Sequence, residues 1–484
     1  MKKAFYISTS IPYVNAAPHI GHALEFIQAD TWARFERARG HDVFFATGTD
    51  ENALKNVQAA RAAGAPVAKF VAERSAMFKK SADKLNVSYN DFIRTSSEKR
   101  HTEGAQKLWS RFKKEDVFKK TYAGLYCVGC ESFKTEKDLL NGRCPDHPNE
   151  SLEKVEEENY FFRLSNYQSR LEKLIASGKL MIIPDSKKNE ILSFIRSGLE
   201  DLSISRSRKR AENWGVPVPS DENQIMYVWV DALSNYIQIL DYASDGKKFQ
   251  RYWNKADKVT HIVGKDINRF HTIYWPAFLL SAGVRLPDTV FVHGFVTIEG
   301  KKMSKSLGAT IDPIELVKKY GVDPVRYYLL REIPAYGDGD WSEKRFRERY
   351  QADLANGIGN FASRVLTLAE KTDELENKIN PEIKKRVSET KEIIAQKMRV
   401  FQFNEALAAL WELISFGDEY INKNKPWETN DKKVIGNLLA LLQVIAKELT
   451  PYLPETGRKI SSYIQERDGK LTAIKPEPLF PRLS

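Results

Sequence analysis

The architecture is first visible in residues 4–46, AFYISTSIPYVNAAPHIGHALEFIQADTWARFERARGHDVFFA. Residues 4–8 are a short β-type run, and residues 21–39 have the pattern of an amphipathic helix that Gly40 can end. Residues 42–46 are a second apolar run. Strand, helix, strand of this length is a βαβ unit, in which the strands run parallel. Ligands of such sheets bind beyond the carboxyl ends of the strands. The sequence therefore predicts an α/β fold with a ligand site at one edge of a parallel sheet.

This pattern is interrupted between about residues 116 and 225, where glycine-bearing turns, acidic runs and all three cysteines replace it. It returns with strand-like residues 259–263, a helix across 267–280 and strand-like residues 289–298. From about residue 346 the pattern predicts one helix after another. We expect a Rossmann-like nucleotide-binding parallel sheet, interrupted by an insertion and followed by an α-helical bundle.

The composition limits the class of protein. A chain of 484 residues exceeds one hydrophobic core, so we expect several domains. A formal net charge of +11 favours a polyanionic partner without naming it. Three cysteines argue against a disulfide-stapled secreted protein, and we find neither a signal-peptide pattern nor an apolar run of about 18 residues. We expect a cytoplasmic protein without a membrane span.

Two short motifs carry residues suited to phosphate chemistry. The first is residues 18–22 (PHIGH), placed where a helix N-terminus favours anions. Its His19 and His22 share one helix face and can donate hydrogen bonds, and Gly21 lets a ligand approach the backbone. The second is residues 301–308 (KKMSKSLG), a basic loop that can fold over a polyphosphate. Each motif alone is also typical of an ordinary surface, because short patterns recur by chance.

Together, in this order and at opposite ends of an α/β pattern, the motifs match the HIGH and KMSKS signatures of class I aminoacyl-tRNA synthetases without a mismatch. Further runs resemble the methionyl branch of that family: residues 10–15 (SIPYVN), 47–51 (TGTDE), 227–232 (YVWVDA) and 264–267 (GKDI). The resemblance extends over essentially the whole chain. It implies an enzyme that activates L-methionine with ATP and transfers it to the 3′ end of tRNA(Met).

A third feature is the spacing Cys127-x2-Cys130-x13-Cys144-x2-His147. Thiolate and imidazole ligands at this spacing form a closed tetrahedral zinc site, so the metal should be structural. The feature resembles the single zinc knuckle that many methionyl enzymes carry in their connective-peptide domain.

For ATP, the resemblance implies a site between the two signatures, with Mg²⁺ on the phosphates. The residues expected to bind ATP are His19, Gly21, His22, Asp266, His293, Lys302, Ser304 and Lys305. The expected catalytic group is His19, Gly21, His22, Lys302 and Lys305. Catalysis would then be positioning plus charge stabilisation, because no covalent enzyme intermediate forms.

For methionine, the resemblance implies that Asp50 pairs with the substrate ammonium. The side-chain pocket would consist of Ile11, Pro12, Tyr13, Trp229, Ala232, Tyr236, Ile267 and His271. Aromatic rings suit a thioether, which is soft and polarizable. One departure is that the family usually continues its Thr-Asp-Glu run with His-Gly, whereas this chain has Asn52 and Ala53. Asparagine can still form hydrogen bonds, but it cannot titrate near neutral pH.

The helical C-terminal part resembles the anticodon-reading region of the family. Asn360 and Arg364 lie in NFASR, which resembles the helix that reads the anticodon. Trp427 lies in KPW, which resembles the segment whose tryptophan stacks on the wobble cytosine. On local sequence alone, Trp427 could also be a helix-start aromatic packed beside a proline.

The resemblance divides the chain into five parts. The catalytic domain is expected at residues 1–115 and 226–290, with the connective-peptide insertion at 116–225 between its two halves. The KMSKS loop with a linking domain is expected at residues 291–345, and the anticodon-binding domain at 346–484. Many bacterial members carry a further C-terminal dimerisation domain, for which no room remains before Ser484. We therefore expect a monomer.

Two alternatives remain open at this point. One is another class I synthetase, for leucine, isoleucine, valine or cysteine. The aliphatic branch normally needs a larger editing insertion, and a cysteinyl enzyme would place its metal in the substrate pocket. The other is a non-catalytic paralogue that binds RNA or a partner; it predicts degenerate ATP motifs, whereas both motifs here are intact.

Overall fold

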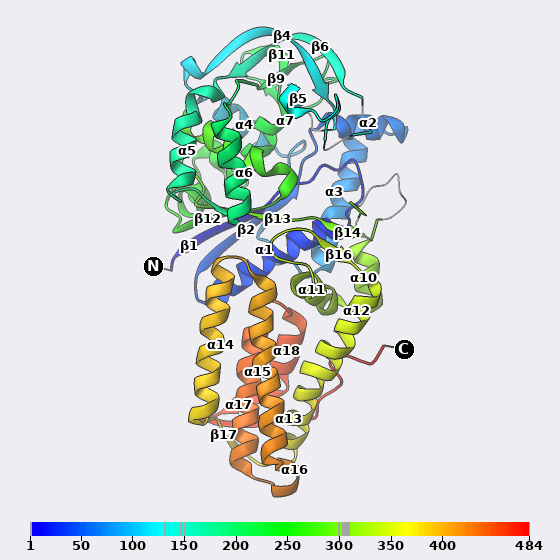
Figure 1. Ribbon diagram of the computed structural model, residues 1–484, viewed down its shortest axis with the longest axis vertical. Helices are drawn as coiled ribbons and strands as arrows, with labels where there is room; N and C mark the ends of the chain where they lie inside the picture. Colours follow the sequence, from blue (N-terminus) through cyan, green and yellow to red (C-terminus); the bar gives the residue numbers. More distant parts are fainter. Residues whose placement is uncertain are drawn as a thin grey trace. The chain divides into compact units, whose positions relative to one another are not determined.

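The computed structural model describes residues 2–129, 132–134, 136–145, 148–149, 151–298, 301–302 and 310–483. The chain forms two compact units (Figure 1). Unit 1 contains Met1–Pro18, Arg39–Asp83 and Ser88–His293, and unit 2 contains His19–Ala38, Lys84–Val87 and Gly294–Ser484. The finer division into five parts stays a prediction.

Unit 1 is built on a six-stranded parallel sheet. Its spatial order is β3 (Asp91–Arg94), β2 (Asp42–Thr49), β1 (Ala4–Thr9), β12 (Lys258–Gly264), β13 (Thr289–His293) and β7 (Met181–Ile183). The parallel pairing expected of residues 4–46 is confirmed, with Phe5 of β1 opposite Val43 of β2. On its other side β1 pairs with β12, so the strand order reverses between these two strands. Ligand sites of open α/β sheets form at such a reversal.

Burial explains why these segments are strands of a parallel sheet. Every residue of β1 is buried, and so is every residue of β2 except Asp42. Near-continuous apolar strands are typical of sheets that are covered on both faces. The apolar core of unit 1 joins Tyr6 and Val263 of the sheet to helices α4 (Lys99–Ser110), α7 (Val228–Gln238) and α9 (Trp275–Ala282). The other helices of this unit are α2 (Leu54–Ala62), α3 (Val67–Lys84), α5 (Gln168–Ala176), α6 (Asp185–Arg196) and α8 (Lys247–Phe249).

The segment expected to be an insertion forms antiparallel sheets. One has the order β5 (Ser132–Lys134), β4 (Val117–Cys127), β6 (Glu153–Phe162), β8 (Leu202–Ser203), and the other the order β10 (Pro217–Val218), β11 (Asp221–Met226), β9 (Ser205–Ser207). Part of the segment nevertheless returns to the main sheet, because β7 pairs in parallel with β13. A strand of three residues has too little periodicity to be seen in the sequence.

The single strand expected over residues 289–298 is wrong. β13 ends at His293, and β14 (Val296–Ile298) belongs to a separate sheet of unit 2, between β15 (Lys301–Lys302) and β16 (Gly339–Trp341). The break lies at Gly294, where an added Cβ would stand 1.8 Å from the carbonyl oxygen of Gly337. Two backbone segments approach each other so closely here that only glycine fits.

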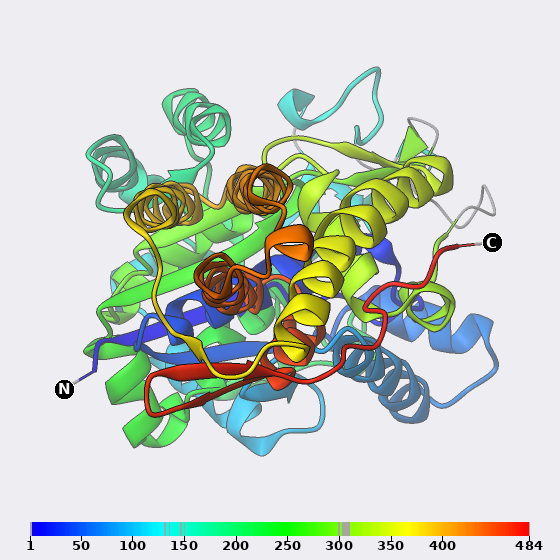
Figure 2. The ribbon, with the colours of Figure 1, turned by 90° about the horizontal axis from the view of Figure 1, so that it is seen from below.

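Unit 2 contains the succession of helices expected from about residue 346, namely α13 (Asn360–Glu370), α14 (Pro381–Arg399), α15 (Phe403–Asn424), α16 (Pro426–Thr429), α17 (Lys432–Leu449) and α18 (Pro454–Ser462). Earlier in the chain it also contains α1 (Ile20–Ala38), α10 (Pro313–Tyr320), α11 (Val322–Arg331) and α12 (Glu343–Arg349). Figure 2 looks along α14, α15 and α17, which pack side by side. A small sheet that the sequence did not predict accompanies them, formed by β17 (Leu375–Glu376), β18 (Ile464–Arg467) and β19 (Lys470–Ala473).

A buried ion pair holds α1 within unit 2. The Arg326 guanidinium of α11 lies 2.8 Å from the Asp30 carboxylate of α1, and both side chains are fully buried. Arg326 also donates to the carbonyl oxygens of Leu85 and Tyr452, at 3.2 and 2.8 Å. A buried charge needs such partners, because its removal from water is costly. None of the helices in the described residues combines the length and the apolar composition that a membrane span requires.

Candidate active site

The carboxyl ends of the central strands bring the predicted methionine residues together in unit 1. The chain leaves β1 through Ile11, Pro12 and Tyr13, and β2 ends one residue before Asp50. Asp266 and Ile267 lie two and three residues after the end of β12. Ser10 donates its backbone N–H to the carbonyl of Ile262, 3.1 Å away. This bond holds the segment after β1 beside the end of β12. The site residues come from distant parts of the sequence because parallel strands end at one edge.

Asp50 is almost completely buried, with 1% of its surface exposed. Its backbone N–H donates to the carbonyl of Pro12 at 2.9 Å, and it forms an isolated parallel bridge with Tyr13. The backbone N–H of Asn52 donates to Asp50 Oδ1 at 3.0 Å. A carboxylate held in this way is fixed in place and can accept a cationic group in a site with little competing water.

Aromatic side chains from α7 and from a π-helical turn, Phe270–Tyr274, come together where the methionine side chain is expected to bind. The Trp229 ring meets those of Tyr13 and His271 edge to face, with centroids 6.3 and 6.2 Å away. The Tyr236 hydroxyl and His271 Nε2 lie 2.6 Å apart. His271 Nδ1 lies 2.8 Å from the carbonyl oxygen of Ile267. A carbonyl can only accept, so Nδ1 carries a proton, and in the neutral ring Nε2 accepts from Tyr236.

Sequence reasoning missed Phe270. Its ring stacks on Trp229 with a centroid distance of 3.7 Å and an interplanar angle of 7°. The only local signal was an aromatic residue next to the predicted His271. Phe270 completes the wall that Trp229 begins, so its place beside that tryptophan could be known only from the fold.

A second residue absent from the predicted site is His261, on β12. It is fully buried, its Nδ1 lies 2.7 Å from Ser8 Oγ, and its ring centroid lies 4.1 Å from that of Tyr236. Burial, together with the nearby His271, holds the pKa of His261 well below its ordinary value. His261 therefore supports the pocket as a neutral ring.

Gly264 shapes the turn after β12. An added Cβ at this position would lie 2.9 Å from Asp266 Oδ1 and 3.8 Å from the His293 ring. The expected ATP residues Asp266 and His293 thus both come close to the space that a side chain at residue 264 would occupy.

The other expected phosphate residues lie in unit 2. Residues His19 and His22 stack with a centroid distance of 3.8 Å, which agrees with a shared helix face. Gly21 donates its N–H to His19 Nδ1 at 3.1 Å, and Ile20 donates to the carbonyl of Ile311 at 3.0 Å. The backbone of Lys302 pairs with Thr297. The side chain of Lys302, and the whole of Ser304 and Lys305, lie outside the described residues.

The structure describes two of the four expected zinc ligands. Cys127, at the end of β4, and Cys144 are both buried, and neither forms a disulfide. Cys130 and His147 lie outside the described residues. Among the residues that are described, no group of three or more histidine, cysteine or acidic side chains is arranged to hold a metal.

The expected anticodon residues come together at one end of the helical bundle. Asn360 and Arg364 lie one turn apart on α13, and the Arg364 guanidinium stands over the Trp427 ring, 5.7 Å from its centroid. Hydrogen bonds to Asp418 and Asn422, of 2.9 and 2.6 Å, fix this guanidinium. Trp427 is 47% exposed, so about half of its surface is open to solvent.

Comparison with known proteins assigns the chain to a family. Residues 5–153 and 147–366 match the family described as tRNA synthetases class I (M), and the chain belongs to that family. The methionine–tRNA ligase of Clostridium acetobutylicum is 41% identical over 483 residues, which cover 96% of this chain and 73% of the relative. That of Brucella suis is 38% identical, with 99% of this chain and 98% of the relative covered. The structure of Mycobacterium tuberculosis methionyl-tRNA synthetase in complex with methionyl-adenylate superimposes with a TM-score of 0.92 at 36% identity, over the full length of both chains.

Burial of neutral His261 predicts a pH dependence of stability. Its folded-state pKa is depressed, so below the ordinary value of 6.5 the unfolded chain binds a proton that the folded chain does not. The free energy of unfolding should therefore fall as the pH drops below 6.5, and His261→Gln should remove up to about 1.4 kcal/mol per pH unit of that slope. Urea unfolding between pH 5 and pH 7.5 measures it, with His41→Gln, at a half-buried surface position, as the control. Equal slopes for wild type and His261→Gln would contradict the prediction.

Proposed function

We propose that this chain is a methionine–tRNA ligase, which forms methionyl-adenylate from L-methionine and ATP and transfers the methionyl group to tRNA(Met). The observation that carries the proposal is the arrangement in unit 1, in which a buried carboxylate, Asp50, lies beside the aromatic group around Trp229. The similarity to relatives named methionine–tRNA ligase, which extends over 96% and 99% of this chain, supports it.

The ammonium group and the side chain of methionine each have matching groups at this site. Asp50 pairs with the ammonium group. The rings of Tyr13, Trp229 and Phe270 give a thioether the polarizable contacts that it favours. Ile11, Pro12, Ala232 and Ile267 fill the remaining space. Tyr236 and His271 hold each other by a hydrogen bond, so the end of the pocket keeps a fixed shape.

Adenylate formation is a displacement at the α-phosphorus of ATP. The methionine carboxylate attacks, the bond to the β-phosphate oxygen breaks, and pyrophosphate leaves. His19 and His22 present ring Nε2 donors at the start of α1, because both Nδ1 atoms accept backbone hydrogen bonds, and Gly21 lets the ligand approach the backbone. Lys302, Ser304 and Lys305 supply donors and positive charge to the leaving group. Asp266 and His293 orient the nucleoside. Mg²⁺, when bound to the phosphates, would supply further neutralisation. The methionyl group then passes to the 2′-hydroxyl of the terminal adenosine of tRNA.

ATP–pyrophosphate exchange with each of the amino acids tests this function. We expect exchange that depends on methionine, with far less for leucine, isoleucine, valine and cysteine. Methionyl transfer should then require a tRNA with the anticodon CAU. Exchange driven best by another amino acid would assign the chain to another branch of the family, and no exchange with any amino acid would favour the non-catalytic alternative.

We also propose one structural zinc ion, held by Cys127, Cys130, Cys144 and His147. Two buried thiols that form no disulfide fit a metal site. Metal analysis of gently purified protein should find one zinc per chain, and Cys127→Ser should lower that content and destabilise the β4–β6 region, since binding energy at such sites is also folding energy. Adenylate formation should survive in soluble Cys127→Ser, because no cysteine is a proposed catalyst. The zinc site would be refuted if the gently purified wild-type protein contained no zinc, or if the Cys127→Ser variant contained as much zinc as wild type.

Trp427 should act on tRNA by stacking. Stacking on an unpaired base is worth about 1–3 kcal/mol, so Trp427→Ala should lower kcat/KM for tRNA(Met) by about 5- to 150-fold. Exchange without tRNA should barely change. Ile474→Ala is a matched control, because Ile474 is 48% exposed and Trp427 is 47% exposed. The aminoacylation rates should be compared for a CAU tRNA and an anticodon-mutated one. If Trp427→Ala prefers CAU as strongly as wild type does, Trp427 does not read the anticodon.

A further inference from the structure

We infer that Asn52 is a positioning residue for methionine, because it joins the loop that carries Asp50 to the helix that carries Trp229 and Ala232. The inference rests on the proposed function.

Asn52 donates hydrogen bonds to two buried carboxylates. Its backbone N–H donates to Asp50 Oδ1 at 3.0 Å, and its side-chain Nδ2 donates to Asp231 Oδ2 at 2.7 Å. Asp50 and Asp231 are each 1% exposed. Bonds to ionised acceptors in so dry a site are strong and directional. One residue therefore fixes the distance between the ammonium-binding carboxylate and α7.

Asp231 lies in the first turn of α7, two residues after Trp229 and directly before Ala232. A shift of Asp231 would carry both pocket residues with it, because they share one short stretch of helix. The link through Asn52 thus sets where the side-chain pocket stands relative to the site of the ammonium group.

The other oxygen of Asp231 is held from the opposite side. His101 of α4 is fully buried, and its Nε2 forms a short hydrogen bond with Asp231 Oδ1. Because an ionised carboxylate only accepts, Nε2 is the donor. Asp231 is therefore placed between a donor from α4 and a donor from the Asp50 loop.

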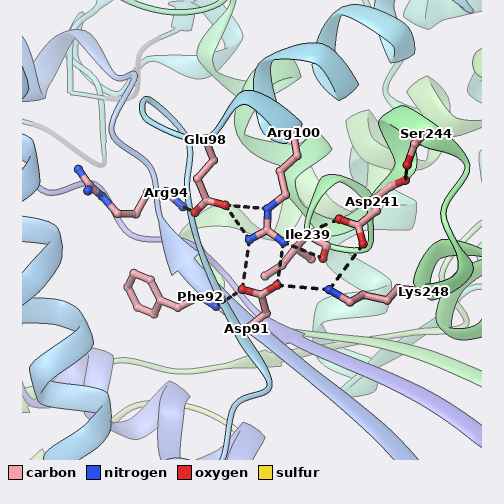
Figure 3. A network of polar contacts seen from close by, with 9 residues as sticks. All are labelled: Asp91, Phe92, Arg94, Glu98, Arg100, Ile239, Asp241, Ser244 and Lys248. Carbon is pink, nitrogen blue, oxygen red and sulfur yellow. Dashed lines mark hydrogen bonds and ion pairs between the residues drawn. The ribbon is translucent and has the colours of Figure 1, made fainter.

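On the α4 side, Arg100 belongs to a network of polar contacts (Figure 3). Arg100, next to His101, forms two hydrogen bonds with Asp91 of β3, at 2.7 and 3.1 Å, and one with Glu98 at 2.7 Å. Lys248 adds an ion pair with Asp241 at 3.5 Å, close to the end of α7. Paired arginine–carboxylate contacts fix geometry as well as charge. The anchor of His101 therefore does not depend on Asn52, and removal of Asn52 should free only the Asp50 side.

An amide suits this place between two carboxylates. Asn52 donates to Asp231 at every pH, because its side chain does not titrate. An aspartate at position 52 would have the same shape, but its side chain could not donate to Asp231 until it bound a proton. The charged or titratable groups around it would be Asp50, Glu51, Asp231 and, on the far side of Asp231, His101. The isosteric variant therefore separates the hydrogen bond from the packing.

The test is methionine-dependent exchange by the full chain. Asn52→Ala should raise the methionine KM about tenfold, the size expected for a lost hydrogen bond to a charged acceptor, with kcat and the ATP KM within about twofold of wild type. Asn52→Asp should show a methionine KM, relative to wild type, that is high at pH 8.5 and falls toward pH 6 as the carboxyl gains its proton. Asn52→His, which restores a donor, should recover most of the affinity.

The control is Asn159→Ala, which removes another buried asparagine–carboxylate bond of unit 1, the 3.0 Å contact of Asn159 Nδ2 with Glu157 Oε1. It should cost stability and leave the methionine KM unchanged. If Asn52→Ala also leaves this KM unchanged, or if Asn52→Asp shows no change between pH 6 and pH 8.5, Asn52 is structural only and the inference fails. Absence of methionine-dependent exchange in wild type would instead reject the proposed function.

Discussion

The site of unit 1 depends on one constraint, the parallel alignment of six strands. Since β1, β2 and β12 run the same way, their carboxyl ends meet at one edge. The strands themselves must be apolar, because a parallel sheet is covered on both faces. Chemistry is thereby left to the residues just beyond the strands, which are Tyr13, Asp50 and Ile267. In each strand, therefore, the apolar residues within the sheet stabilise the fold, and the residues just beyond its carboxyl end are available to bind a ligand.

Polar groups at this edge are held mainly by one another. The Tyr236–His271–Ile267 chain fixes a tautomer, and Asp231 is held between Asn52 and His101. Buried polar groups are costly unless paired, so each pairing also removes alternative arrangements. In unit 2 the Asp30–Arg326 pair does the same for α1, the helix that begins with the HIGH residues. Both proposed halves of the chemistry therefore rest on buried charge that is fully partnered.

Periodicity and short motifs predicted what is local. The first strand, helix and strand were expected at residues 4–46 and are found at Ala4–Thr9, Ile20–Ala38 and Asp42–Thr49. The sequence predicted that Tyr236 and His271 belong to one site and that Arg364 and Trp427 belong to another, but it did not predict that the members of each pair are in contact. What depends on distant segments was missed. The break at Gly294 follows from the approach of Gly337, and the partner of Asn52 lies 179 residues away.

The π-helical turn Phe270–Tyr274 shows how backbone geometry serves the pocket. In it the N–H of Trp275 donates to the carbonyl of Phe270, five residues back. The wider turn lets two consecutive residues reach the same ring: Phe270 stacks on Trp229, and His271 meets it edge to face. His271 then ties its own ring to the carbonyl of Ile267, four residues back. Such turns are rare and are frequent at functional sites. Here the turn coincides with the stacked Trp229–Phe270 pair and with an imidazole that is fixed to the carbonyl of Ile267.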